Sequence, residues 1–241
     1  MNIEKNTCNV LTSEKGNVLF LILIAVALFA ALSYAVTQST RSGGGDASKE
    51  TNLVNAAGLT QYPASIKTSI TRMLVSSGVT ADDLLFDLPP FTDLTTAPLQ
   101  ARGVFYPGTT SGGGGGATYN PAPANVMASN SPGTWYFNGE NQVVNIGTGG
   151  ALSTSNADVI AFLPGVTLSV CQSIHQRLGL STTIIDLNAL ALLISTNMDF
   201  ADQNIDAGGA TITGANLDGQ PQGCFQKPTG TYVYYHVIVE R

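Results

Sequence analysis

Two side chains with reactive chemistry lie four positions apart in the sequence, Cys171 and His175. Apolar residues recur every three or four positions around them and Gly179 follows, so the segment 168–178 predicts a short helix. On one helix face, a thiol and an imidazole could act as nucleophile and base. The sequence offers no obvious third residue to orient the imidazole, and we therefore expect that the protein is not an enzyme.

A group of aspartates lies in a Gly- and Asn-rich stretch near the C-terminus: Asp199, Asp202, Asp206 and Asp218. Carboxylates suit calcium, but a calcium-binding loop of about 12 residues needs alternating ligands, a central glycine and a closing glutamate. The spacing here lacks that pattern, so solvated turn residues are the favoured interpretation. Calcium stays as a weak hypothesis, and we expect no other cofactor.

The histidines His175 and His236 fall in separate elements, without the short Cys/His spacing of a zinc site. His236 belongs to the segment Thr231–Val239, which is rich in β-branched and aromatic residues and predicts a strand covered on both faces. We therefore expect His236 to be a hydrogen-bonded core residue and predict no metal centre.

The elements that position these residues follow from the hydrophobic periodicity of the chain. The first predicted element is a β-hairpin over 134–146 that turns at Asn138-Gly139. A buried strand over 159–163 follows and ends at Pro164-Gly165. After the helix 168–178, an apolar segment over 184–194 fits a helix slightly better than a strand. Strands and helices in this order indicate an α+β domain.

Before these elements, apolar residues at helical spacing predict a surface helix: Ile66, Ile70, Met73 and Leu74. We expect Pro63 to open this helix and Gly78 to end it in a left-handed cap. A later segment, 98–132, is rich in Gly, Pro, Ser and Asn and predicts a flexible insertion.

The most apolar stretch is Val18–Val36, nineteen residues without charge, proline or glycine. As a helix it would extend about 28 Å, which matches the roughly 30 Å hydrocarbon core of a bilayer. The stretch is apolar all round, which favours a membrane span over the amphipathic helix of a soluble protein. The alternative is a helix buried in a soluble core.

A polar leader of sixteen residues precedes this stretch and ends in Glu14-Lys15-Gly16. A short hydrophilic leader, a basic residue, a glycine and then one apolar helix resemble the type IV pilin and type II secretion pseudopilin superfamily. The resemblance implies that a prepilin peptidase cuts on the cytoplasmic side, between Gly16 and Asn17, and methylates the new amino terminus.

The mature chain implied by this resemblance departs from the usual pattern at two positions, Asn17 and Leu21. The family usually has an apolar residue first and a glutamate fifth, and that glutamate is thought to meet the amino terminus of a neighbouring subunit. Some minor pseudopilins at filament tips also lack the glutamate. The resemblance therefore implies a tip or initiator subunit rather than a major one.

The expected organisation has four parts. These are a prepilin-type leader over 1–16, a transmembrane helix over 17–41, a Gly-rich hinge over 42–52 and an exported α+β domain over 53–241. The resemblance implies that in this last domain helices pack on an antiparallel sheet, as in pilins.

The chain has three cysteines, of which Cys8 lies in the leader. Cleavage would leave Cys171 and Cys224 as one possible disulfide pair in the exported domain, and pilin-like domains often tie their C-terminal segment down in this way. The alternative is two buried free thiols in a reducing compartment.

These features together predict a minor pilin or pseudopilin-like structural subunit. We expect it in the bacterial inner membrane as a single-pass protein, with the N-terminus cytoplasmic and the C-terminal domain periplasmic or extracellular. The implied partners are membrane lipid, the prepilin peptidase and other pilin-like subunits. Nucleic acid is not expected, because the net charge of −6 would be repelled by phosphate. The alternative is a binding module held by an uncleaved signal anchor.

Overall fold

The computed structural model describes residues 15–76, 78, 80–81, 84, 121–153, 156–195, 209–214 and 216–241, without the side chains of 15–17 and 39–47. Cys8, most of the leader and most of the predicted insertion lie outside the described residues. The chain divides into two compact units, Met1–Lys49 and Glu50–Arg241. Each unit is described by itself.

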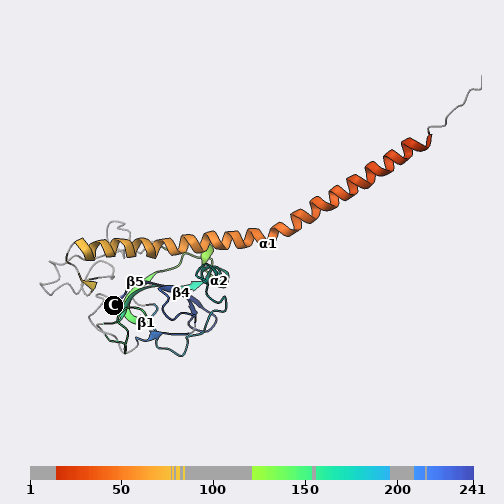
Figure 1. The fold of residues 1–241 in the computed structure, drawn as a ribbon. Helices are drawn as coiled ribbons and strands as arrows, with labels where there is room; N and C mark the ends of the chain where they lie inside the picture. Colours follow the sequence, from red (N-terminus) through yellow and green to blue (C-terminus); the bar gives the residue numbers. More distant parts are fainter. Residues whose placement is uncertain are drawn as a thin grey trace, which may run out of the picture. The chain divides into compact units, whose positions relative to one another are not determined.

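The described part of the first unit is the beginning of helix α1, which spans Lys15–Ser76 (Figure 1). The apolar segment predicted from the sequence is helical, and Val18–Gln38 is long and apolar enough to cross a membrane. The backbone is also helical through Gly43–Gly45, within the predicted hinge 42–52. The boundary between the units, at Lys49, falls in the same range, and bending there stays a prediction.

The second unit is built on a five-stranded sheet with the strand order β3-β1-β2-β5-β4. The strands are β1 (Tyr136–Val143), β2 (Asp158–Val166), β3 (Thr211–Ile212), β4 (Gln222–Gln226) and β5 (Tyr232–Val239). Neighbours pair antiparallel except β1 and β3, which pair in parallel. The α+β class is confirmed, and the sheet is mixed rather than purely antiparallel.

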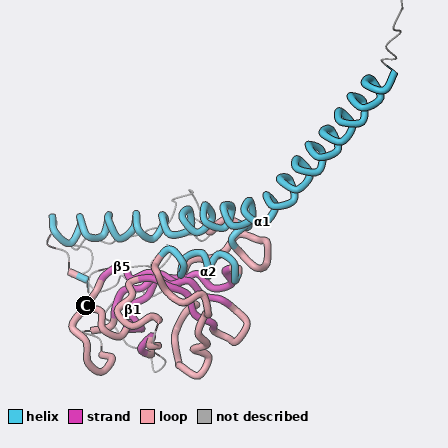
Figure 2. The backbone as a smooth tube through the Cα atoms, turned by 45° about the vertical axis from the view of Figure 1, so that its right-hand side comes forward, coloured by secondary structure: helices cyan, strands magenta, loops and turns pink. Residues whose placement is uncertain are grey.

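One face of the sheet is covered by two helices, the part of α1 within the second unit and α2 (Leu168–Arg177), which lie on the same side of the strands (Figure 2). The predicted stripe of α1 packs here: Ile66 and Ile70 are buried, and Met73 and Leu74 are partly buried against the same cluster. The helix α2 confirms the element predicted over 168–178. A short 3-10 helix, η3 (Ala124–Val126), adds Val126 to this core.

The opposite face of the sheet forms a second hydrophobic cluster, covered by loops rather than helices. Strand β5 contributes to both clusters, with Tyr234 on the helix side and Val233, Tyr235 and Val237 on the loop side. Alternate side chains of a strand point to opposite faces, so a central strand must be apolar throughout. The predicted C-terminal strand, covered on both sides, is therefore confirmed.

Pro63 lies inside α1 and does not open a helix, so that prediction was wrong. Proline removes a backbone donor and crowds the preceding turn, which normally ends or kinks a helix. Here the residue is buried, and its neighbour Tyr62 contacts Trp135 with ring centroids 5.4 Å apart and the ring planes tilted by 50°. Burial of Pro63 and the contact of Tyr62 with the core therefore favour a continuous helix. The helix ends at Ser76, before Gly78, whose φ is +65° as predicted for its cap.

The predicted hairpin over 134–146 was also wrong. Asn138 and Gly139 lie within the single strand β1, and the antiparallel partner is β2 rather than a returning arm of the same segment. The register between β1 and β2 shifts between Asn138 and Asn141, so the Asn-Gly sequence forms an irregularity within the strand instead of a turn. The aromatic residues Trp135 and Phe137 are in the core as expected.

Two further boundaries differ from the prediction. Strand β2 continues through Pro164 to Val166, because Pro164 still faces Val233 of β5. The segment 184–194 is not a helix: the N–H of Gln226 donates to the carbonyl of Ile185 and the N–H of Leu187 donates to the carbonyl of Gln226. Pairing with the edge strand β4 holds residues 185–187 extended, and a turn follows at Asn188-Ala189. Leu187 still packs in the core.

Candidate functional site

The candidate anchor, Val18–Gln38, exposes its large apolar side chains on all sides. Phe29 is 76% exposed and Leu21, at the position where the pilin pattern has glutamate, is 59% exposed. Uncharged apolar side chains around the full circumference suit contact with lipid or with other apolar helices. The polar side chains near its end are satisfied locally: Thr37 donates to the carbonyl of Ser33, and the Gln38 amide donates to the Tyr34 hydroxyl.

The predicted processing site lies at the start of the same helix. The residues Gly16 and Asn17 have helical backbone in the first turn of α1, which begins at Lys15. The backbone conformation alone does not determine whether a peptidase cuts here. Cleavage at this bond therefore stays a prediction.

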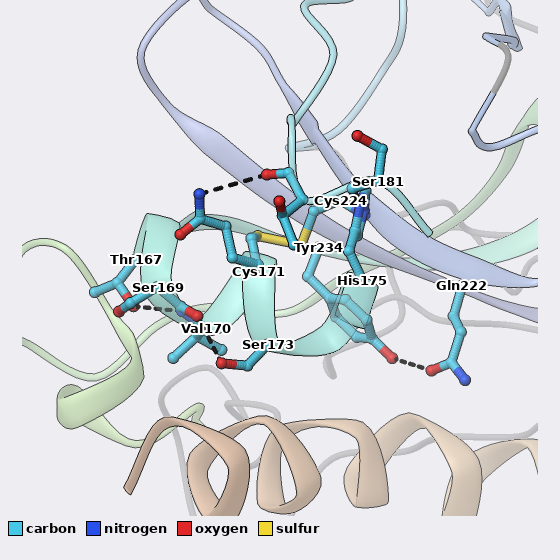
Figure 3. The surroundings of a disulfide bond; sticks show 12 residues. Thr167, Ser169, Val170, Cys171, Ser173, His175, Ser181, Gln222, Cys224 and Tyr234 are labelled. Carbon is cyan, nitrogen blue, oxygen red and sulfur yellow. Dashed lines mark hydrogen bonds between the residues drawn. A yellow bond between two sulfur atoms is a disulfide. The ribbon is translucent and has the colours of Figure 1, made fainter. Parts of the chain in front are cut away.

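A disulfide joins Cys171 of α2 to Cys224 of β4, with the two Cα atoms 5.7 Å apart (Figure 3). Both cysteines are fully buried in the helix-side core. The bond closes a separation of 53 positions and attaches the edge strand of the sheet to the helix that covers it. The free-thiol alternative does not hold in this structure.

Both ring nitrogens of His175 are occupied by backbone groups. Its Nδ1 lies 2.7 Å from the carbonyl oxygen of Ser181, and its Nε2 accepts from the N–H of Cys224 at 2.9 Å. These partners fix the neutral tautomer with hydrogen on Nδ1. Burial lowers the pKa of His175, against the opposing effect of these hydrogen bonds. The disulfide also consumes the thiol of Cys171, so Cys171 and His175 do not form a thiol-imidazole pair in this structure.

His236 belongs to a buried polar chain on β5 and β4. The hydroxyl of Tyr234 donates to Oε1 of Gln222 at 2.9 Å, and Nδ1 of His236 lies 2.9 Å from the same hydroxyl. The phenol has one hydrogen, so the imidazole N–H donates to its oxygen. Burial, together with the charge of Lys67, lowers the pKa of His236 to about 4. The prediction of a hydrogen-bonded core histidine is confirmed.

Of the four calcium candidates, Asp199, Asp202 and Asp206 lie outside the described residues. Asp218 is described and caps a turn: its Oδ1 accepts from the N–H of Gly214 at 2.8 Å and from the Thr213 hydroxyl at 3.3 Å. Within the described part of the chain, no three acidic, histidine or cysteine side chains come together as a metal site would require. Calcium binding by the whole stretch stays a hypothesis.

Sequence reasoning missed a buried polar cluster at the irregularity of β1. The amide of Asn141 donates to the carbonyl of Leu193 at 2.8 Å, and its oxygen accepts from the N–H groups of Leu193 and Ala210. Asn138 donates to the same Leu193 carbonyl at 3.1 Å. The two asparagines thereby attach the loop segments on either side of 196–208 to the sheet. The signal in the sequence was the polar run 138–142 inside an otherwise apolar strand.

Asp158, at the start of β2, is the second residue that the sequence did not single out. Its carboxylate is fully buried and accepts from the N–H of Val143 at 2.8 Å and from the N–H of Arg241 at 3.1 Å. Burial raises the pKa of Asp158 to about 6, although both hydrogen bonds oppose that rise. The carboxylate thus connects Val143, at the end of β1, to Arg241, which lies two residues beyond the end of β5.

Comparison with known proteins gives no relative: no family model, no curated protein and no solved structure matches the chain.

Proposed function

We propose that the chain is a minor pilin-like or pseudopilin-like subunit of a type IV pilus or a type II secretion filament. The observation that carries the proposal is that two parts of α1 differ in their surroundings. One part of this helix exposes an apolar segment of 21 residues, and a later part packs on a sheet through Leu59, Ile66 and Ile70. A helix of this kind can act both as an anchor and as one wall of a folded domain.

Two further features support the proposal. The sequence Lys15-Gly16 stands immediately before the apolar segment, where a prepilin peptidase would cut. The disulfide between Cys171 and Cys224 is the kind of bond that persists in an oxidising compartment such as the periplasm. The proposed location is therefore the bacterial inner membrane, with the second unit outside the cytoplasm.

The proposed mechanism is mechanical and needs no catalytic residue. In the membrane, lipid covers the apolar side chains of Val18–Gln38. In a filament, the same side chains would be covered by the helices of neighbouring subunits, with close packing replacing lipid contacts. Leu21 offers no charge for a neighbouring amino terminus, which favours a tip or initiator position.

The experiment compares filament assembly by the native chain, Gly16→Val and Gly58→Val in the native host. Gly58 is exposed on α1, and a Cβ added there meets no atom within 4 Å, so this variant is a matched control for the same substitution. We expect Gly16→Val to remain in the membrane fraction with its leader, while Gly58→Val enters sheared filaments like the native chain. Equal assembly by all three would overturn the proposal and favour a binding module with an uncleaved anchor.

A further inference from the structure

A small pocket lies in the second unit at the end of α2. Its volume is about 110 Å³, and its walls come from three elements. The lining residues are Thr60 of α1, Ile174, Arg177 and Leu178 at the end of α2, and Gln222 of β4. Pockets for drug-sized ligands begin at roughly 300 Å³, so this one has room only for a small functional group with a short stem.

The first polar wall of the pocket is Arg177, in the last turn of α2. The side chain is exposed, and it forms no ion pair with any described residue. Burial and the neighbouring Tyr235 raise the pKa of Tyr234, whereas the charge of Arg177 opposes that rise. The positive charge of Arg177 therefore interacts electrostatically with the Tyr234 phenol, which is hydrogen-bonded to Gln222 of the pocket.

The second polar wall is the amide of Gln222, whose orientation is fixed by a hydrogen bond from Tyr234. Its Oε1 accepts from the Tyr234 hydroxyl, which in turn lies within hydrogen-bond distance of His236. Figure 3 shows the amide oxygen directed at Tyr234 and the amide nitrogen pointing away from it. No described residue accepts a hydrogen bond from this nitrogen, so Nε2 is left as a donor at the pocket.

The remaining walls are apolar or already satisfied. Ile174 is buried, Leu178 is partly buried, and the Thr60 hydroxyl donates to the carbonyl of Ala57 at 3.0 Å. The pocket thus offers a cation and an oriented amide donor beside aliphatic carbon. A guanidinium fork matches the two oxygens of a carboxylate. A fully hydrated inorganic anion would gain little from the aliphatic wall.

We propose that this pocket binds the carboxylate of a short aliphatic acid, with Arg177 and Nε2 of Gln222 donating to its oxygens and Ile174 and Leu178 contacting its carbon stem. Binding converts two unpaired donors into charge-assisted hydrogen bonds and covers the end of α2. The same chemistry is present in a free acid such as propionate and in the side chain of a glutamate from another protein. This inference does not depend on the filament role.

The experiment follows the side-chain N–H signals of Gln222 and Arg177 by NMR in the isotope-labelled full chain in detergent micelles. Propionate is the probe, propionamide is its uncharged isostere, and inorganic phosphate is the hydrated anion, all at constant ionic strength. We expect saturable shifts of both signals with propionate and none with the other two. Equal shifts with propionamide or phosphate, or no saturable shift with propionate, would overturn the proposal.

Three variants locate the binding. Arg177→Gln removes the exposed cation and should weaken propionate binding by about tenfold or more, because a charge-assisted hydrogen bond is lost. Thr60→Leu leaves the charge in place but fills the pocket, and it should abolish the shifts. Arg72→Gln removes an exposed arginine of α1 outside the pocket and should bind like the native chain. Native binding by both pocket variants would contradict the assignment.

A second titration identifies the source of the carboxylate. Glutamate capped as its N-acetyl N-methylamide carries the propionate-like side chain on a peptide backbone. Shifts with both propionate and capped glutamate assign the pocket to an acidic side chain of a partner protein. Shifts with propionate alone assign it to a free acid, and shifts with neither overturn the proposal.

Discussion

The imidazole Nε2 of His175 accepts a hydrogen bond from the backbone N–H of Cys224 at 2.9 Å. Cys224 is also the residue whose sulfur is bonded to Cys171, one helical turn before His175. Helix α2 is therefore attached to β4 twice at the same point, once by a covalent bond and once by a hydrogen bond. The other ring nitrogen of His175 holds the Ser181 carbonyl, which fixes the chain as it leaves α2.

Replacing His175 with leucine should destabilise the second unit. His175→Leu leaves the buried Cys224 N–H without its partner, at a cost of about 1–3 kcal/mol. The Ser181 carbonyl also loses its partner, but it belongs to an exposed residue and can bind water instead. The free energy of unfolding, measured by denaturant titration of the full chain in detergent, should fall accordingly. Gln176→Ala, at the exposed neighbouring position, is the control and should change little. Equal stability of the two variants would show that the imidazole contacts contribute nothing.

Removing the disulfide should cost more than removing the imidazole. The bond closes a loop of 53 positions, and the chain-entropy model gives roughly 4 kcal/mol for a loop of that length. The double variant Cys171→Ala, Cys224→Ala should therefore lose stability by an amount of this order. Cys8→Ala, outside the second unit, is the control. A double variant as stable as Cys8→Ala would contradict the structural role of the bond.

Acidification should destabilise the fold through His236. Its pKa is lowered from 6.5 to about 4 by burial and by Lys67, so the unfolded chain binds the proton more readily than the folded chain. The neutral imidazole contributes stability above pH 6.5, and this is lost as the pH falls toward 4. The loss should reach about 3 kcal/mol.

The measurement compares the free energy of unfolding of the native chain with that of His236→Asn at pH values from 6.5 down to about 4. Asparagine keeps a polar partner for the Tyr234 hydroxyl but does not titrate in this range. The stability difference between the two proteins should narrow as the pH falls. A difference that stays constant with pH would mean that His236 titrates normally in the fold.

Asp158 should give the opposite pH dependence. Its pKa is raised from 3.8 to about 6 by burial, so the folded chain holds the proton more tightly than the unfolded chain. The stability that follows from protonation is present below 3.8 and is lost as the pH rises through about 6. Relative to the native chain, Asp158→Asn should gain up to about 3 kcal/mol between these limits.

Asp186→Asn is a matched control for the pH dependence of the free energy of unfolding. The Thr229 hydroxyl and the N–H of Asn188 lower the pKa of Asp186, so its ionised form is the one favoured by the fold. Relative to the native chain, Asp186→Asn should lose stability as the pH rises through the acidic range. Slopes of the same sign for the two variants would contradict the burial argument for Asp158.

Elements whose residues carry their own pattern could be predicted from the sequence. Strand β5 and helix α2 are of this kind, because β-branched and aromatic residues occupy both faces of β5 and apolar residues recur at helical spacing in α2. The burial of Cys171 and the core position of His236 followed from the same patterns. The pairing of Cys171 with Cys224 was predicted from the cysteine count and the pilin resemblance, and the structure contains this bond. The contact of His236 with Tyr234 was not predicted.

Elements that depend on distant partners could not be predicted in this way. The Asn138-Gly139 sequence is a turn signal by itself, but the two buried asparagines of β1 bind the backbone of Leu193, far along the chain. The segment 184–194 has a helical pattern but is not a helix, because β4 binds the backbone of residues 185–187 in an extended conformation. Pro63 stays within α1 because packing around Tyr62 outweighs the local preference.

If the chain is processed like a pilin, its amino terminus in the native membrane is Asn17 rather than Met1. The measurement is mass spectrometry of the N-terminal peptide from the protein isolated in that membrane. We expect a chain that starts at Asn17 with a methylated amino group. A chain that retains its leader from Met1 would contradict it, and would leave a signal-anchored protein whose second unit acts outside any filament.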